Sequence, residues 1–343
     1  MYLYKQYLLR AVCVCPLREI ANPGASGSAF YFSHNNEFII KTVSIKEAKF
    51  LVQLLPQYFM NIQENKQTLL PKFYGLYQYK SGCKTITFVI MNNWLPSSLS
   101  LQEKYDIKGS TYGRKASVKE CQKSSPTFKD LDLLEHHAKG FLLDKEIYKA
   151  LIQTLTRDCR VLESFKIMDY SLLIGVYKTD GSFGSFHGDL TDGTDGWEDV
   201  DECVIHESTN AVFLTQNGTI SSLTAEGRSS INPLASRNRI SLFSTPLEAI
   251  ALDCNLDFTD GQEEPQDIPP GGIPALNADG EQVFIFLGII DILQSYGVKK
   301  RLEYFFKSLY SNRNTISVNP PDKYKSRFLT FQTKVFTYDQ QGD

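Results

Sequence analysis

A lysine in a short apolar run, with a turn of small residues ahead of it, is the first chemical signal in the chain. Residues 24–28 read Gly-Ala-Ser-Gly-Ser, and such small residues let backbone amides approach an anionic phosphate. Lys41 ends the apolar run 38–41, where a strand would turn its ammonium group inward beneath the turn. Together they indicate a site for nucleotide phosphates. The alternatives are an ordinary turn and an edge-strand lysine that faces water.

Two aspartates stand where apolar runs meet loops. Asp169 interrupts the apolar stretch 166–173, and Asp291 directly follows the run 284–290. Burying a carboxylate without a partner is costly, so a metal ion or a lysine is the natural partner for each. Phosphoryl transfer needs two such acids, one to position or deprotonate the attacking hydroxyl and one to hold magnesium. A helix cap or a surface turn is the alternative for either residue.

The residues around Lys41 predict a small, sheet-rich lobe. Its expected strands are residues 30–32, 38–43, 73–79 and 85–91. The first two flank a polar turn and predict a hairpin. A helix is expected over 46–62, where Pro56 would bend or end the first segment.

A long helix is expected to form the spine of a second lobe, with Asp144 as its N-cap. Its predicted inward stripe is Ile147, Leu151, Leu155, Leu162 and Phe165. Residues 170–177 and 283–292 are apolar and predict buried strands. Between them, residues 178–279 are rich in Gly, Asp, Ser, Thr and Pro, which indicates a largely disordered insertion with a short strand at 212–214.

Composition limits the class of protein. The chain has 343 residues, 42% of them hydrophobic and 22% charged, which is ordinary for a globular protein of two lobes. A net charge of -3 argues against a nucleic-acid binder that works by overall charge. Seven scattered cysteines favour a reducing cytosol over a secreted disulfide framework. No run approaches the roughly 18 apolar residues of a membrane span, so membrane contact is expected to be peripheral.

Several motifs occur in the order and wording of one family. The matching blocks are residues 22–28, 37–43, 69–77, 91–93, 105–112, 127–132, 165–173 and 288–296. On these the chain resembles the phosphatidylinositol phosphate kinases, and most closely their type I members. The resemblance implies a two-lobed α+β fold, distantly similar to protein kinases, with antiparallel sheets, packed helices and ATP between the lobes.

The resemblance also implies roles by position. The implied ATP contacts are Gly24, Ser26, Gly27, Ser28, Lys41, Met91, Asn92 and Asn93. Asp169 would be the catalytic-loop carboxylate, and Asp291 would hold Mg²⁺. The pair Arg157-Asp158 could be mistaken for a protein-kinase catalytic loop. It lies within the expected long helix, where the loop geometry cannot form, and is assigned no catalytic role.

Charged residues in the family-like segment 106–114 would lie beside the cleft. Lys108 could neutralise the phosphate in transfer, and Arg114 could grip the phosphate already on the substrate. Asp106 could orient this basic group. The alternative is a salt-bridged surface loop.

The segment after Asp291 indicates which lipid is used. Residues 298–309 form an amphipathic helical pattern with several basic residues, which suits an anionic membrane surface. In the resembled family this is the activation or specificity loop, and type I enzymes carry a basic pair and then leucine-glutamate. Lys300, Arg301 and Glu303 take those places, although Arg301 replaces the usual lysine and Tyr304 a histidine. The implied reaction is 5-phosphorylation of phosphatidylinositol 4-phosphate.

Two other functions remain open, a phosphatidylinositol 5-phosphate 4-kinase and a phosphoinositide-binding pseudokinase. The expected parts are a poorly matching segment 1–21, an N-lobe at 22–96, and a C-lobe at 97–343 with its specificity loop at about 292–318. The expected ligands are ATP, Mg²⁺ and phosphatidylinositol 4-phosphate in anionic membranes, with no nucleic acid. The protein is expected in the cytoplasm, peripherally bound to the cytoplasmic face of the plasma membrane. A homodimer is an open alternative, because the family's dimer-forming elements lie in the poorly matching region.

Overall fold

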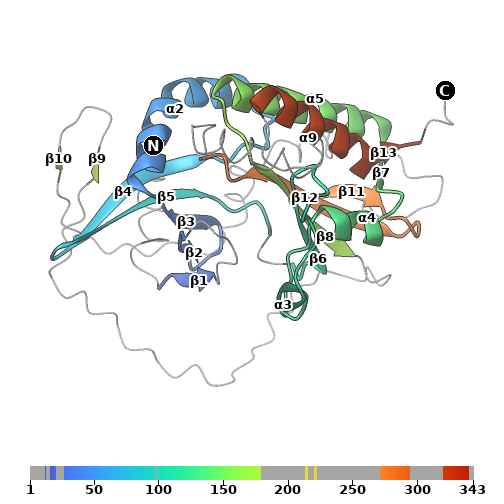
Figure 1. Cartoon of the computed structure of the whole chain (residues 1–343), viewed down its shortest axis with the longest axis horizontal. Coiled ribbons are helices and arrows are strands. Elements are labelled where there is room, and N and C mark those ends of the chain that lie inside the picture. The colour runs from blue at the N-terminus through green and yellow to red at the C-terminus, as the bar shows by residue number, and fades with distance from the viewer. Residues whose placement is uncertain are drawn as a thin grey trace, which may run out of the picture.

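Two large β-sheets, a two-stranded sheet and several helices make up the described part of the structure, a computed structural model (Figure 1). The described residues are 12, 16–20, 27–96, 99–178, 213–214, 220–221, 271–293 and 320–339. Their helices are α2 (Ile45–Glu64), α3 (Val118–Cys121), α4 (Asp130–His136), α5 (Lys145–Ser164) and α9 (Pro321–Val335). Within these ranges, no helix combines the length and the apolar character needed to cross a bilayer. The expected α+β class, with antiparallel sheets and packed helices, is confirmed.

The first sheet has five antiparallel strands in the order β1-β2-β3-β5-β4. They are β1 (Arg18–Ile20), β2 (Phe30–Phe32), β3 (Phe38–Thr42), β4 (Phe73–Ser81) and β5 (Lys84–Asn92). In the β2–β3 turn, Asn36 has a φ of 54°, a left-handed conformation that asparagine adopts more readily than most residues. Phe38 and Ile40 are buried on β3, which holds the strand in the core. The four strands predicted for this lobe are confirmed.

Helix α2 begins at a capping box, in which the Ser44 side chain accepts from Glu47 N and the Glu47 side chain accepts from Ser44 N. Its core face includes Leu54 and Tyr58, one on each side of Pro56. Pro56 was expected to bend or end the first segment, and it does not end it, because one helix continues through it. Proline cannot donate to the carbonyl four residues earlier, but that residue is exposed and water can satisfy it.

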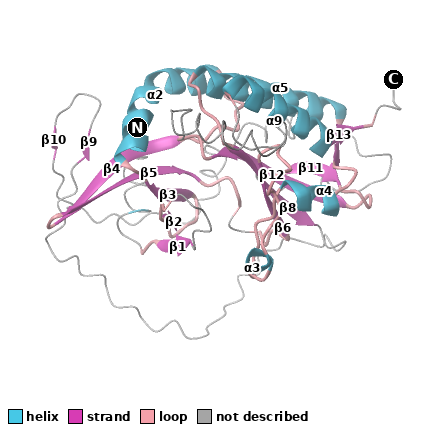
Figure 2. Cartoon of the chain, in the orientation of Figure 1, coloured by secondary structure: helices cyan, strands magenta, loops and turns pink. Residues whose placement is uncertain are grey.

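The second sheet has six strands in the order β13-β7-β11-β12-β8-β6. They are β6 (Glu103–Ile107), β7 (Phe141–Leu143), β8 (Ser171–Lys178), β11 (Ile273–Leu276), β12 (Gln282–Ile290) and β13 (Phe336–Tyr338). All pairs are antiparallel except β13 with β7. Helices α5 and α9 run side by side over this sheet (Figure 2), joined by a 2.6 Å ion pair between Glu163 and Lys325.

Helix α5 is the spine that the sequence predicts. The Asp144 side chain accepts from Glu146 N and Ile147 N, so the expected N-cap is confirmed. Four members of the predicted stripe are buried, and Phe165 is half-buried against the same core.

Two strands lie beyond the expected boundaries of the lobes. Strand β1 lies within the segment 1–21 that the sequence left outside the lobe, yet it pairs with β2 along its whole length. Strand β11 lies within the segment 178–279 that was expected to be a largely disordered insertion, and it is an interior strand between β7 and β12. The short strand expected at 212–214 is confirmed as β9 (Phe213–Leu214), which pairs with β10 (Ile220–Ser221). Most of the remaining insertion lies outside the described residues.

Candidate active site

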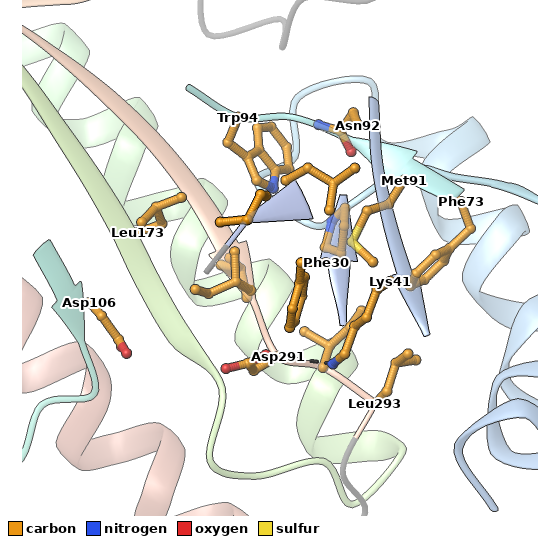
Figure 3. A pocket seen from close by; sticks show the side chains of 16 residues that line it. Phe30, Lys41, Phe73, Met91, Asn92, Trp94, Asp106, Leu173, Asp291 and Leu293 are labelled. Carbon is orange, nitrogen blue, oxygen red and sulfur yellow. Dashed lines mark ion pairs between the residues drawn. The ribbon is translucent and has the colours of Figure 1, made fainter. Parts of the chain in front are cut away.

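A cavity of about 290 Å³ opens between the two sheets (Figure 3). Apolar side chains from both sheets and their connection line most of it, among them Ile20, Phe30, Ile39, Phe73, Met91, Trp94, Leu173 and Ile290. Lys41, Asp106 and Asp291 supply its charged groups. Gly288 leaves room for the indole, since a Cβ there would lie 2.1 Å from Trp94 Cγ. The cavity therefore combines apolar walls with a charged region, which suits a flat ring that carries an anionic tail.

Strand register brings three charged residues to one end of the second sheet. The last residue of β12, Ile290, pairs with Ser171, the first residue of β8. The last residue of β6 pairs with the second residue of β8. The same end of the sheet therefore carries Lys108 after β6, Asp169 before β8 and Asp291 after β12. Lys108 and Asp291 are 183 positions apart in the chain (291 − 108).

Lys41 lies inward, with only 7% of its side chain exposed. Its Nζ is 3.8 Å from Asp291 Oδ1 and 3.9 Å from Glu47 Oε1. The Phe30 ring centroid lies 5.3 Å from the same atom, close enough for a cation–π contact. The ammonium is thus held between carboxylates of both lobes and against the cavity wall (Figure 3). A lysine so placed can meet the phosphates of a nucleotide in the cavity.

Asp169 is held by Lys108. The Lys108 Nζ donates to Asp169 Oδ1 and to the Asp169 carbonyl, each at 2.9 Å. Each side chain of this pair is 15% exposed, so the pair is partly shielded from water. Asp169 has a φ of 69° and Asp291 a φ of 63°. Non-glycine residues pay for this left-handed conformation, and such strain is concentrated at functional sites.

The carboxyl of Asp291 has its pKa raised. Burial is the main cause, although 40% of its side chain still faces the cleft. The carboxylates of Asp106 and Asp169 raise the pKa further, whereas Lys41 and Lys108 lower it. A divalent cation at this carboxylate would relieve the repulsion.

The carboxylates at the cavity fit a magnesium ion that also binds substrate phosphates better than a metal ion bound only by protein side chains. Among the residues that the structure describes, no three His, Cys, Asp or Glu side chains gather as a metal site. Magnesium commonly binds through one or two carboxylates together with the phosphate oxygens of its substrate and water. Asp291 in the cavity meets that requirement.

The basic segment after β6 is braced by carboxylates. Arg114 Nε donates to Asp130 Oδ2 at 2.7 Å, and its Nη2 donates to the side chain and the carbonyl of Asp106. The buried Asp130 Oδ1 also accepts from Lys108 N at 3.0 Å and Ser110 N at 3.1 Å. Burial lowers the pKa of Arg114, but the two aspartates outweigh this and raise it overall. The guanidinium is therefore a fixed cation that shapes this segment.

Helix α9 supports the same end of the second sheet. Tyr324 Oη donates to the carbonyl of Tyr170, directly after Asp169. Arg327 Nη2 donates to the carbonyl of Lys108 at 3.3 Å. Gly109 has a φ of 67°, and a Cβ there would lie 3.0 Å from Phe328 Cα, so only glycine fits. These contacts fix the backbone on either side of the Lys108–Asp169 pair.

Comparison with known proteins identifies the family. The family model described as phosphatidylinositol-4-phosphate 5-kinase matches residues 11–335. This chain belongs to that family. It is similar to phosphatidylinositol 4-phosphate 5-kinase type-1 beta of Homo sapiens, at 44% identity over 96% of this chain and 54% of that protein. It is 42% identical to the Drosophila melanogaster type-1 sktl enzyme, over 93% of this chain and 42% of the relative.

The type-1 alpha protein of Rattus norvegicus is 43% identical over 94% of this chain and 52% of its own length. The chain thus spans about half the length of these relatives. The family inferred from the sequence motifs is confirmed. Because the match begins at residue 11, the later part of segment 1–21 belongs to the family region, which agrees with the position of β1.

The predicted site residues of this family member fall into three groups. Lys41, Met91, Asn92, Asp106 and Asp291 line the cavity, and Lys108 and Asp169 pair at the edge of the same sheet. Gly27 and Ser28 precede β2, where Gly27 has a φ of 66°. Gly24, Ser26, Lys300, Arg301 and Glu303 lie outside the described residues.

Two predicted residues make contacts that the sequence does not reveal. Asn93 is turned toward the β2–β3 hairpin, where its Nδ2 donates to the Asn36 carbonyl at 2.9 Å. It is not among the residues that line the cavity. Arg114 already bridges two aspartates, so a role in gripping the lipid phosphate stays a prediction.

Sequence reasoning missed several residues that build the site. Glu47 could have been found, since Ser44 and Glu47 have capping-box spacing and the helix follows Lys41 closely. Asp130 lies in the matching block 127–132, but its partners lie 16 to 22 residues away in the chain. Tyr324 and Trp94 gave no signal, because ordinary core aromatics have the same local pattern.

Proposed function

We propose that this protein is a lipid kinase that transfers the γ-phosphate of ATP to the 5-hydroxyl of phosphatidylinositol 4-phosphate. The observation that carries the proposal is the convergence of two lysine–aspartate pairs: Lys41 with Asp291, which both line the cavity, and Lys108 with Asp169, at the end of the second sheet that also carries Asp291. Phosphoryl transfer needs cations for the phosphates and a carboxylate for the attacking hydroxyl. The names of the relatives, type-1 phosphatidylinositol 4-phosphate 5-kinases, support the choice of lipid.

The mechanism follows from the positions of the side chains. The adenine ring lies among the apolar walls, and the triphosphate extends toward Lys41, whose ammonium neutralises phosphate oxygens. Asp291 would hold Mg²⁺, which would supply further positive charge for the phosphates when bound. Asp169 orients the inositol 5-hydroxyl and accepts its proton while the new oxygen–phosphorus bond forms and ADP leaves. Lys108, 2.9 Å from Asp169, stabilises the charge that develops on the transferring group.

The experiment is a kinase assay with magnesium, ATP and vesicles that contain either phosphatidylinositol 4-phosphate or phosphatidylinositol 5-phosphate. We expect labelling of the 4-phosphate lipid, with the new phosphate on the 5-hydroxyl. Asp169→Asn should lower kcat by about 10²- to 10⁴-fold, the usual contribution of a general base, with nucleotide affinity unchanged.

Two outcomes would overturn the proposal. Preferential labelling of the 5-phosphate lipid would make the protein a 4-kinase. Binding of both lipids without turnover by the wild-type protein would make it a pseudokinase.

We further propose that the protein works at the cytoplasmic face of the plasma membrane, with Lys300 and Arg301 facing anionic lipid. Each basic residue near such a surface contributes about 1 kcal/mol. The double variant Lys300→Glu and Arg301→Glu should no longer bind anionic vesicles in a flotation assay but should still bind ATP. Unchanged vesicle affinity would remove this role. Sedimentation of the wild-type protein tests whether a homodimer forms.

A further inference from the structure

The pair Arg157-Asp158, which resembles a protein-kinase catalytic loop only in its residue types, holds the connection between α2 and β4 of the first lobe against the second lobe. Asp158 is completely buried on α5. Its Oδ2 accepts from Leu69 N at 2.7 Å and from Thr68 Oγ1 at 3.0 Å. Arg157 Nη2 donates to the carbonyl of Gln67. The spine helix of the second lobe therefore holds three successive residues of the connection between α2 and β4.

The clamped segment leads directly to the magnesium aspartate. The Leu69 carbonyl accepts from Ile289 N at 2.8 Å, and Ile289 is two residues before Asp291 on β12. Thr68 Oγ1 also accepts from Leu70 N at 3.1 Å, which keeps the segment in one conformation. A displacement of residues 68–69 would therefore move the end of β12.

The same segment leads to the lysine of the first lobe. Pro71 lines the cavity, and its carbonyl accepts from Tyr58 Oη at 2.6 Å. Tyr58 lies on α2, the helix whose first turn carries Glu47 beside Lys41. The connection thus contacts α2, whose Glu47 lies beside Lys41, and β12, which leads to Asp291.

Stability alone gives little reason for a carboxylate at this position. Burial raises the pKa of Asp158 to about 6, against the opposing effects of Leu69 N, Thr68 Oγ1 and Arg157. A buried ion can often be replaced by a packed apolar residue without loss of stability. Two directed hydrogen bonds to a backbone segment give it a fixed position, which apolar packing does not.

We infer that Asp158 is a positioning residue for phosphoryl transfer, which through Leu69 and Ile289 sets Asp291 where the magnesium–nucleotide complex needs it. The inference rests on the proposed kinase function. It predicts that loss of the clamp weakens the magnesium-dependent part of nucleotide binding more than nucleotide binding itself.

The test measures the affinity of the full chain for a fluorescent ATP analogue, with excess Mg²⁺ and with EDTA. Asp158→Ala should reduce the gain in affinity due to Mg²⁺ at least tenfold, while affinity in EDTA changes less than twofold. Thr68→Val keeps the side-chain shape but removes the hydrogen bond to Asp158 and the one from Leu70 N, and should reduce the gain about threefold. Asp158→Asn retains an acceptor for Leu69 N and should restore most of the gain.

Leu155→Ala is the matched control, because Leu155 is equally buried on α5 one turn earlier. Its thermal midpoint should fall while the Mg²⁺ gain stays within twofold of wild type. A wild-type gain in Thr68→Val and in any folded Asp158→Ala, or an equal loss in Leu155→Ala, overturns the inference. If Asp158→Ala does not fold, Thr68→Val decides.

A lipid assay of the wild-type protein separates this result from the proposed function. If the wild-type protein turns over lipid but the variants keep the wild-type increase in nucleotide affinity due to Mg²⁺, only the positioning role of Asp158 is refuted. Absence of lipid turnover with a clamp-dependent gain removes only the proposed substrate. If Mg²⁺ does not change the nucleotide affinity of the wild-type protein, both the proposed kinase function and the positioning role are refuted.

Discussion

Replacing Asp158 by asparagine should change how the stability of the protein depends on pH. The pKa of Asp158 is raised from 3.8 to about 6, with burial as the main cause. Among the described residues, the charged and titratable groups that interact with it include Arg157, Tyr58 and Cys159. Asparagine has nearly the same shape and cannot ionise, so it isolates the contribution of the charge.

The sign follows from the raised pKa. The folded protein holds the Asp158 proton more tightly than the unfolded chain, so protonation favours folding. This stabilisation is complete below about pH 4 and is lost as the pH rises through about 6. The difference between a pKa of 3.8 and one of about 6 corresponds to about 3 kcal/mol of folding stability. About 2 kcal/mol of this stabilisation is lost between pH 4.5 and 7.5. Full burial leaves little solvent screening to reduce the effect.

Urea unfolding of both proteins at four pH values between 4.5 and 7.5 gives the difference directly. The free energy of unfolding of Asp158→Asn, minus that of wild type, should grow by about 2 kcal/mol toward the higher pH. Other titrating groups cancel in the difference. Leu155→Ala is the control, and its offset from wild type should stay constant. A constant offset for Asp158→Asn as well would show that the carboxyl titrates normally, and the argument from burial would be refuted.

Three further substitutions test the cavity and its supports. Lys41→Met should raise the KM for ATP at least tenfold, because two carboxylates lose their cation and the phosphates lose theirs; an unchanged KM would contradict the role of Lys41. Gly288→Ala should raise the KM for ATP with little change in that for lipid, because the new methyl group pushes Trp94 into the cavity; equal changes in both would count against this location. Tyr324→Phe should cost about 1 to 3 kcal/mol in urea unfolding, because a buried carbonyl next to Asp169 loses its donor, and kcat should fall more than KM changes. An unaltered kcat would limit Tyr324 to a role in stability.

Elements fixed by neighbours in the sequence were predicted well. The β2–β3 hairpin has a polar turn between apolar runs, and α5 has an N-cap followed by an apolar stripe. Both patterns reflect local hydrogen bonds and one buried face. These depend on residues that are close together in the chain, so they can be recognised from a single sequence. The sequence could not show that α2 continues through Pro56, because this depends on whether the unpaired carbonyl meets water, which only the fold decides.

Contacts between distant segments could not be predicted in the same way. The sequence shows Asp169 and Asp291 as acids at the ends of apolar runs, but their proximity depends on the β8–β12 register. A shift of one residue would keep both runs apolar and reverse the facing of every side chain on one strand. The hydrogen bond between Asp158 and Leu69 spans 89 residues, and nothing in either local pattern announces it.

The two aspartates of the site share a physical problem that explains why so many long-range contacts surround them. Each has a left-handed backbone, which costs about 1 to 3 kcal/mol and persists only where the surroundings hold it. Lys108 holds Asp169 through its carboxylate and its carbonyl. Asp291 faces Lys41, and its strand is held through Ile289 by the connection that Asp158 clamps. Groups from both lobes therefore hold the strained backbones of Asp169 and Asp291 in place. A change in the relative position of the lobes would act first on these residues, which meet the phosphates.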